Sequence, residues 1–157
     1  MKKVNEFVNE LSTTNNKKLL SACRSLLTDR LPPYALMYIA KYVTYQKDFE
    51  AFQVIAASIA KKVPNTNSYT SLGNAIAKLD YVTNKSNQES IRMDRLLRAE
   101  TTEDIIEQYT KMIGILSSKH IEVNHTQLLK DFIFFNDEVK HRWAMDYFKV
   151  QEFNDEV

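Results

Sequence analysis

The chain has 157 residues, of which 44% are hydrophobic and 26% are charged, as in an ordinary soluble globular protein. Two glycines and three prolines are too few for an all-β protein built on many tight turns, and they favour long helices joined by short links. The single cysteine, Cys23, excludes an internal disulfide. With no run of about 18 apolar residues and no apolar stretch typical of a signal peptide, we expect a cytoplasmic protein without a membrane anchor.

The net charge of +1 conceals an uneven distribution along the chain. Residues 1–99 carry 15 basic and 8 acidic side chains, a net charge of +7, whereas residues 100–157 carry 6 and 12, a net charge of −6. The excess is steepest over 11–47, where six basic residues stand against Asp29 alone. Such asymmetry predicts a surface for nucleic acid or another anionic partner on one part of the molecule. The alternative is that folding mixes the two halves in space.

Apolar side chains in the first third of the chain recur with the period of a helix. An amphipathic helix is predicted over the first eleven residues, and a second helix begins after the polar stretch 12–16, which supplies an N-cap, and ends before Pro32. The segment 34–47 is apolar almost all round, so we predict that it forms the central buried helix. A further helix is predicted over 49–63, ending at Pro64.

The remaining two thirds continue as short helices separated by polar stretches. Loops are predicted over 64–70 and 81–87, on either side of a helix at 71–79. Thr101 to Asp104 marks a helix start with carboxylates at its positive end, and Asn124 is a further N-cap candidate. The sequence therefore predicts an all-α fold, a single compact bundle-like domain over 1–157 with about eight or nine helices.

Three of the six arginines fall within seven residues, at Arg92, Arg95 and Arg98. On a helix they sweep an arc of about 120°, roughly opposite to an apolar stripe of Met93, Leu96 and Leu97. Each guanidinium group presents a planar fork of donors that can grip a pair of phosphate oxygens. The row therefore predicts an anion-binding or nucleic-acid-binding face. The alternative is a solvated helix face with local ion pairs, such as one between Asp94 and Arg98.

Residue patterns for catalysis or metal binding are missing from the sequence. The histidines His120, His125 and His141 lack the spacing of metal ligands, and we expect them at the surface or in helix caps. Two glycines cannot build a phosphate-cradling loop, and no Ser-His-Asp arrangement stands out. We therefore expect a protein that is not an enzyme, with no cofactor and no metal. An enzyme would need a pocket that brings histidine and carboxylate groups together from separate parts of the chain.

Three blocks, in this order and spacing, resemble the CasB family, the small α-helical subunit of the type I-E CRISPR surveillance complex Cascade. Residues 71–77, Ser-Leu-Gly-Asn-Ala-Ile-Ala, are similar to the family's Ser-Leu-Gly-Arg-Ala-Leu-Ala helix start. Residues 89–99 resemble its Arg-x-x-Arg-Leu-Leu-x-Ala helix. Residues 128–148, with Arg142-Trp143-Ala144 near the end, resemble its closing Arg-Trp-Ala-x-x-Phe segment. Asn74 departs from the arginine often found in the first block, which removes one expected phosphate contact.

The resemblance implies a non-catalytic function. Two copies of the small subunit would associate within the complex, beside its backbone and large subunits. There they would contact the guide RNA and the target DNA through basic residues and stabilise the R-loop. Contacts with backbone phosphates are independent of sequence and sensitive to salt, as suits a scaffold for arbitrary targets. The alternative is a helical adaptor whose basic face docks an acidic protein, without touching nucleic acid.

Residues can be assigned to the implied phosphate contacts in order of priority. The first set is the row on the predicted arginine helix, Arg92, Arg95 and Arg98. A second, weaker set comprises Lys17, Lys18 and Arg24, near the basic stretch that the family places in its first half, together with Lys41. Arg142 matches the closing block, but it could equally stack on Trp143 or pair with Asp146.

Overall fold

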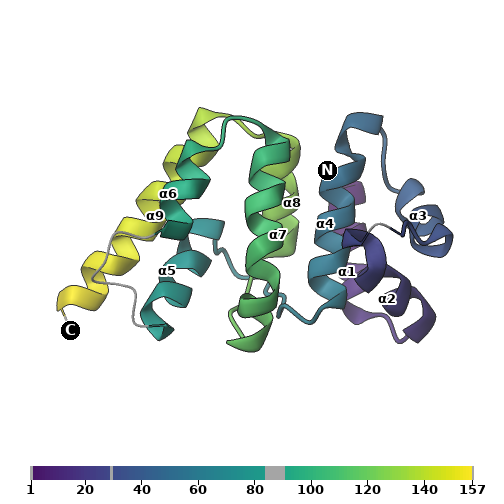
Figure 1. The fold of residues 1–157 in the computed structure, drawn as a ribbon, viewed down its shortest axis with the longest axis horizontal. Coiled ribbons are helices and arrows are strands. Elements are labelled where there is room, and N and C mark those ends of the chain that lie inside the picture. The colour runs from purple at the N-terminus through teal and green to yellow at the C-terminus, as the bar shows by residue number, and fades with distance from the viewer. Residues whose placement is uncertain (1, 29, 84–90, 157) are drawn as a thin grey trace.

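A computed structural model describes residues 2–28, 30–83 and 91–156, without the side chains of residues 2 and 150–156. Over these ranges it shows nine α-helices, two short 3-10 helices and no β-strand, which confirms the predicted all-α class (Figure 1). None of the described helices is long and apolar enough to cross a membrane. In chain order the elements are α1 (Lys2–Thr13), α2 (Lys17–Arg24), η1 (Ser25–Leu27), α3 (Pro33–Ala40), η2 (Gln46–Asp48), α4 (Phe49–Ala60), α5 (Leu72–Val82), α6 (Ile91–Arg98), α7 (Thr102–Ser118), α8 (His125–Ile133) and α9 (Asp137–Glu156).

The helices form three groups along the long axis of the molecule (Figure 1). Helices α1 to α4 lie at one end, α7 and α8 in the middle, and α5, α6 and α9 at the other end. Helix α4 packs against α1, α2, α7 and α8, and α5 packs chiefly against α9. The central buried helix is thus α4, and the prediction that 34–47 fills this place was wrong. Alanines on several sides of α4 let its neighbours approach closely, whereas α3 carries bulky side chains around most of its circumference.

Side-chain caps start the helices where the sequence predicted them. Asn16 accepts a hydrogen bond from the backbone N–H of Leu19 at 3.0 Å, and Asn124 accepts one from Gln127 at 3.0 Å. Thr101 caps α7 in the same way, through the N–H of Asp104. Of the predicted loop over 81–87, residues 81 and 82 instead belong to α5, and residues 84–87 lie outside the described residues.

Helices α4 and α7 end in the same motif, one beside the other. Lys62 and His120, two residues past the last helical residue, adopt positive φ angles of 69° and 55°. The N–H groups of Lys62 and Val63 return to carbonyls of α4, and the N–H groups at 120 and 121 return to α7, as in a Schellman motif. A parallel bridge between Asn65 and Val123 then joins the two chain segments.

A glycine sets the distance between α5 and α9. A Cβ atom built on Gly73 would lie 1.9 Å from the carbonyl oxygen of Trp143 and 2.7 Å from its carbonyl carbon. Both of these atoms belong to the backbone of α9, so a larger residue would push the two helices apart. Next to Gly73, Asn74 completes a capping box with Ser71 and donates a hydrogen bond to the carbonyl of Asp146 at 3.4 Å. The first resemblance block is therefore the packing seam between α5 and α9.

Folding mixes the basic and acidic halves of the chain in part. Helix α6, from the basic half, packs against α7 and α9 of the acidic half, and α8 packs against α1 and α4. Helices α2 and α3, which lie within the segment 11–47 of steepest positive excess, remain together at the far end of the molecule (Figure 1). The separation of charge in the sequence therefore survives in space mainly at that end.

Candidate nucleic-acid interface

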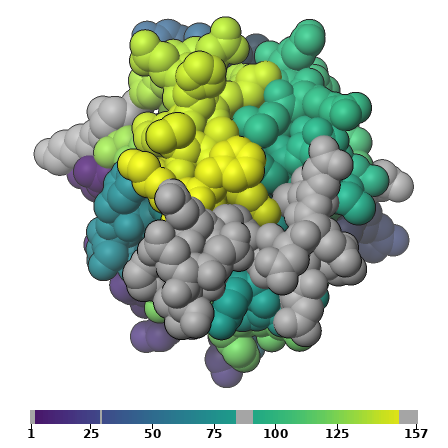
Figure 2. Space-filling view, turned by 90° about the vertical axis from the view of Figure 1, so that its left-hand side faces the viewer, coloured from purple at the N-terminus to yellow at the C-terminus, as the bar shows by residue number. Residues whose placement is uncertain are grey.

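Helix α6 lies at the surface beside α9, at the end of the molecule seen in Figure 2. Met93 and Leu96 are buried, as the apolar stripe predicted. On the opposite side, Ile91, Arg95 and Arg98 are exposed. The outward face of α6 therefore holds two of the three predicted arginines, with one isoleucine among them.

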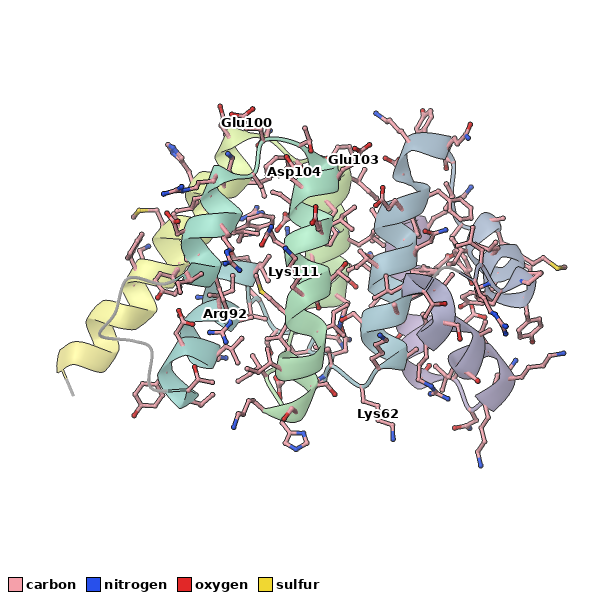
Figure 3. The ribbon with its side chains drawn as sticks, viewed as in Figure 1. Lys62, Arg92, Glu100, Glu103, Asp104 and Lys111 are labelled. Atoms are coloured by element: carbon pink, nitrogen blue, oxygen red, sulfur yellow. The ribbon has the colours of Figure 1, made fainter. Side chains whose placement is uncertain are left out.

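Arg92 points to the interior of the protein rather than to solvent. Its Nη1 donates a hydrogen bond to Oδ1 of Asp80 on α5 at 2.8 Å, and the other carboxylate oxygen accepts one from the hydroxyl of Tyr147 on α9 at 2.8 Å. The Asp80 side chain is 1% exposed and that of Arg92 is 27% exposed. Figure 3 shows Arg92 between α5 and α6. The charge of Arg92 thus compensates the buried carboxylate of Asp80. The two hydrogen bonds to this carboxylate join α5, α6 and α9.

The two exposed arginines of α6 differ in their surroundings. The Nε of Arg98 lies 3.1 Å from a carboxylate oxygen of Asp94, the local pair that the sequence suggested, with the Arg98 side chain 79% exposed. Glu100, Glu103 and Asp104 gather around the connection to α7, past the end of α6 (Figure 3). Arg95 makes no ion pair within the part of the chain that the structure describes. Of the two, Arg95 is thus the cation without an ion pair among the described residues, and Arg98 has Asp94 beside it and further carboxylates past the end of the helix.

The second predicted set lies at the other end of the molecule. Lys17, Lys18 and Arg24 on α2, and Lys41 just after α3, are all exposed. The ammonium group of Lys18 lies 4.8 Å from the centre of the Tyr34 ring, a cation–π contact. The structure therefore packs the helices that carry or precede this set, α2 and α3, against each other, at the opposite end of the molecule from α6 (Figure 1).

Arg142 has neither of the two partners that its neighbours suggested. It donates a hydrogen bond to Oδ1 of Asp131 on α8, while the indole N–H of Trp143 donates to Oδ2 of the same carboxylate at 3.1 Å. Asp131 is almost fully buried, and Asp146 instead accepts a hydrogen bond from Tyr69 at 3.1 Å. The third resemblance block is therefore a hydrogen-bonded unit that fastens α9 to α8.

The sequence analysis missed both buried aspartates, although each carries a signal. Asp80 follows Ile76 by four residues, and Asp131 lies between Leu128 and Phe132, so both occupy the apolar faces of their helices. A buried carboxylate needs a cationic or hydrogen-bonding partner. Those positions could have predicted that some of the arginines serve folding.

His125 lies in a buried polar network rather than at the surface or in a helix cap, where it was expected. The Oδ1 of Asn65 accepts hydrogen bonds from the backbone N–H of His125 at 3.1 Å and from its Nδ1 at 2.9 Å. Nε2 is then the acceptor for the Ser58 hydroxyl, 2.8 Å away, whose oxygen accepts from Tyr109 at 2.7 Å. Burial lowers the pKa of His125 to about 3 and raises the pKa of Tyr109 well above its usual range. The imidazole is therefore neutral.

Ser58, His125 and Asn65 are the residue types of a hydrolase triad, but the Ser58 hydroxyl is not accessible to a substrate. Ser58 and His125 are both 0% exposed, so no substrate reaches the hydroxyl. The hydrogen bonds of this network connect α4, α7 and α8 to one another and to the segment before α5. Its role is therefore structural. His120 and His141 are exposed, as expected.

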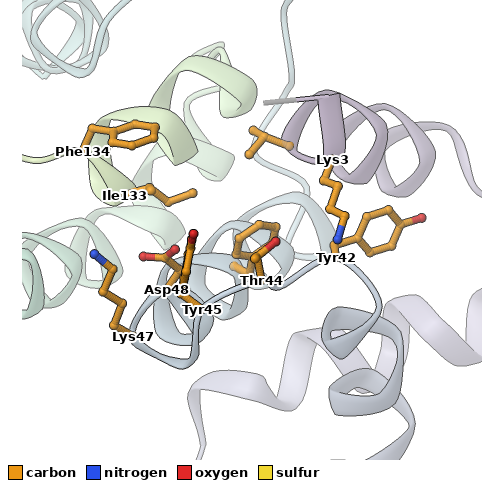
Figure 4. A pocket seen from close by; sticks show the side chains of 10 residues that line it. Lys3, Tyr42, Thr44, Tyr45, Lys47, Asp48, Ile133 and Phe134 are labelled. Carbon is orange, nitrogen blue, oxygen red and sulfur yellow. The ribbon is translucent and has the colours of Figure 1, made fainter.

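Three cavities open on the described surface, and none has the lining of a catalytic site. The first, of about 200 Å³, lies between the start of α1, the chain before α4 and the end of α8, and its polar lining includes Lys3, Lys47 and Asp48 (Figure 4). The second, of about 500 Å³, lies between α4 and α7 and is lined by four carboxylates, among them Glu50 and Glu107. The third is lined mainly by amide side chains. None of the three is lined by a histidine, and no group of metal-ligating side chains occurs among the described residues.

Comparison with known proteins identifies the family. The family described as CRISPR-associated protein Cse2 matches the chain over residues 18–148, a range that contains all three resemblance blocks. No curated protein and no solved structure matched the chain. Because the family match extends over well more than half of the sequence, the chain belongs to the Cse2, or CasB, family, the small subunit of the type I-E CRISPR complex Cascade.

Proposed function

We propose that this protein is a non-catalytic subunit of an RNA-guided DNA surveillance complex in the cytoplasm. In that complex it contacts nucleic-acid backbone and stabilises the R-loop formed by guide RNA and target DNA. The observation that carries the proposal is the family match over residues 18–148. The residues 1–157 act as one domain, and two copies associate within the complex, beside its backbone and large subunits.

The exposed arginines of α6 are the first candidates for the phosphate contacts. Arg95 and Arg98 face solvent on one side of the helix, and guanidinium groups bind phosphate oxygens without reading sequence. Arg92 and Arg142 are held by buried carboxylates, so we assign them to positioning α6 and α9, with any phosphate contact secondary. Lys17, Lys18, Arg24 and Lys41 form a separate and weaker set at the other end.

Fluorescence anisotropy with labelled single- and double-stranded DNA tests the contact. Binding is measured at about 50 and 200 mM salt for the wild type and for Arg95→Ala/Arg98→Ala. Loss of two phosphate contacts should weaken binding to all sequences alike and lower the slope of log K against log salt by about 2. Lys61→Ala/Lys62→Ala is the matched control, since these cations are also adjacent and exposed but lie at the end of α4.

The outcomes separate the proposal from its alternative. If the control variant weakens binding as much as the α6 variant does, α6 has no special part in the contact. If the wild type does not bind DNA even at about 50 mM salt, the adaptor function is favoured, in which the basic face meets an acidic protein. Each variant is first shown by thermal unfolding to be as stable as the wild type.

A further inference from the structure

The outward face of α3 is apolar, although the helix lies at the edge of the molecule (Figure 1). Its exposed positions fall within an arc of about 120° on the helical wheel. They are Pro33, Tyr34, Met37, Ala40 and, just after the helix, Lys41. Met37 is 68% exposed, and Leu31, immediately before the helix, is 56% exposed. Four of the five outward positions are thus apolar, while Ala35 and Ile39 on the other side are in the core.

Two cations border this apolar face, and a carboxylate lies near its end, that of Glu10 on α1, which accepts a hydrogen bond from Tyr42, just past Lys41. Lys18 sits over the ring of Tyr34, and Lys41 continues the exposed face. The Nδ2 of Asn16 donates a hydrogen bond to the Tyr34 hydroxyl at 3.0 Å, which holds the ring in place. Along the chain, Asp29 is the single acidic residue between Glu10 and Asp48. The face therefore has an apolar centre with a cation at two points of its border, Lys18 and Lys41.

The chemistry of this face suits a protein partner better than nucleic acid. Leu31, Met37 and Ala40 are aliphatic, and a phosphate backbone offers them nothing to pack against. Base stacking requires aromatic rings, of which the face has one, Tyr34. Exposed apolar patches bordered by polar residues mark interaction sites in soluble proteins. The partner that complements this patch has apolar side chains at its centre and carboxylates at its border.

We propose that the outward face of α3 binds an amphipathic helix of another protein, whose apolar stripe packs on Leu31, Tyr34 and Met37 and whose flanking carboxylates pair with Lys18 and Lys41. A helix with apolar residues at every third or fourth position matches the spacing of the α3 stripe. The proposal deepens the proposed function, on which it rests, because it gives the chemistry of a partner within the complex. It does not depend on phosphate contacts by α6.

Site-specific crosslinking identifies what covers the face. Met37 is replaced with the photocrosslinker p-benzoylphenylalanine, and the protein is assembled with guide RNA and the other subunits of its complex, then irradiated and digested for mass spectrometry. The expected product joins position 37 to a peptide of another subunit that contains an acidic amphipathic helix. A crosslink to nucleic acid, to a second copy of this chain or to an unrelated surface, or no crosslink at all, would overturn the proposal. Tyr81, which is 56% exposed on α5, is the matched control position for the photocrosslinker.

A charge variant tests the same face by assembly. Leu31→Glu/Met37→Glu places two carboxylates in the apolar centre, where a partner with acidic flanks would be repelled. Because both side chains are exposed, the variant should fold with unchanged thermal stability. We expect its affinity for the complex to fall about tenfold or more, while Tyr81→Glu assembles as the wild type does. Wild-type affinity in the double variant would contradict the proposal.

The two proposals fail in different experiments. The difference in the salt slope of DNA binding between the wild type and Arg95→Ala/Arg98→Ala tests these two arginines, and that difference should be the same when both proteins also carry Leu31→Glu/Met37→Glu. Conversely, Arg95→Ala/Arg98→Ala should leave the crosslink from position 37 unchanged. Loss of the crosslink with normal DNA binding would therefore count against the α3 face alone.

Discussion

Arg92 on α6 and Asp80 on α5 form an ion pair of 2.8 Å whose carboxylate is sealed from solvent. The hydroxyl of Tyr147 on α9 supplies the second hydrogen bond to Asp80, so the pair ties three helices into one unit. The first arginine of the α6 row therefore has a different role from the next two. A variant that removes all three arginines would combine a loss of stability with any loss of binding, and its phenotype would have no single interpretation.

The roles of the arginines can be separated by stability measurements. Arg92→Ala leaves the buried Asp80 carboxylate with the hydrogen bond from Tyr147 but without its cation, and we expect a loss of about 2–3 kcal/mol in the free energy of unfolding. Arg95→Ala removes an exposed side chain and should change that free energy by less than about 0.5 kcal/mol. Urea unfolding followed by circular dichroism measures both. Equal stabilities of the two variants would show that the Arg92–Asp80 pair does not stabilise the fold.

The two glycines should respond in opposite directions to the same substitution. Gly73→Ala places a methyl group against the backbone of Trp143, so α5 and α9 must separate, and we expect a loss of about 3 kcal/mol or more. At Gly114 in α7 the added Cβ meets nothing within 4 Å, and alanine is the better helix former. Gly114→Ala should therefore stabilise the protein by about 0.5–1 kcal/mol. Melting temperatures of both variants test the contrast, and a tolerated Gly73→Ala would place α5 farther from α9 than described.

His125 should make the protein less stable in acid. Its pKa is about 3 in the folded state, against 6.5 ordinarily, so between these values the unfolded chain binds a proton that the folded chain does not. The contribution is complete above about pH 6.5 and is lost as the pH falls toward 3, with a slope of at most about 1.4 kcal/mol per pH unit.

His125→Gln removes this titration, so the difference in unfolding free energy between wild type and variant isolates it from the carboxylates that both share. Urea unfolding between about pH 4.5 and 7 should show a shallower pH dependence in the variant. Parallel curves for the two proteins would mean that the buried imidazole is not neutral, or not buried.

The residues that end α4 and α7 offer a route to higher stability. Lys62 and His120 adopt left-handed backbone angles, which glycine adopts without the steric cost of a Cβ atom. Lys62→Gly and His120→Gly should each raise the free energy of unfolding by up to about 1 kcal/mol. Lys61→Gly, one residue earlier and at negative φ, is the control and should destabilise instead. If all three glycine variants were destabilised, the left-handed backbone angles of Lys62 and His120 at these helix ends would be contradicted.

Much of the local structure follows from the sequence. Helix periods, the Asn16, Thr101 and Asn124 caps and the scarcity of glycine predicted an all-α fold, because these signals act between residues a few positions apart. The three blocks were enough to indicate the family, which the match over residues 18–148 confirmed. Phosphate contact by the basic residues stays a prediction.

The tertiary structure decided what the polar residues do and which helix lies at the centre. A charged side chain has the same sequence signature whether it meets solvent or a buried carboxylate, and the partner of Arg92 is 12 residues away on another helix. In the same way, apolar content could not tell α3 from α4, because burial depends on which helices can approach closely, not on hydrophobicity alone. The sequence by itself determined that the chain is helical, where the capped helices begin, and the family. Long-range packing decided that Arg92 and Arg142 hold the fold together, that His125 is sealed inside, and that an apolar face of α3 is left uncovered on this chain.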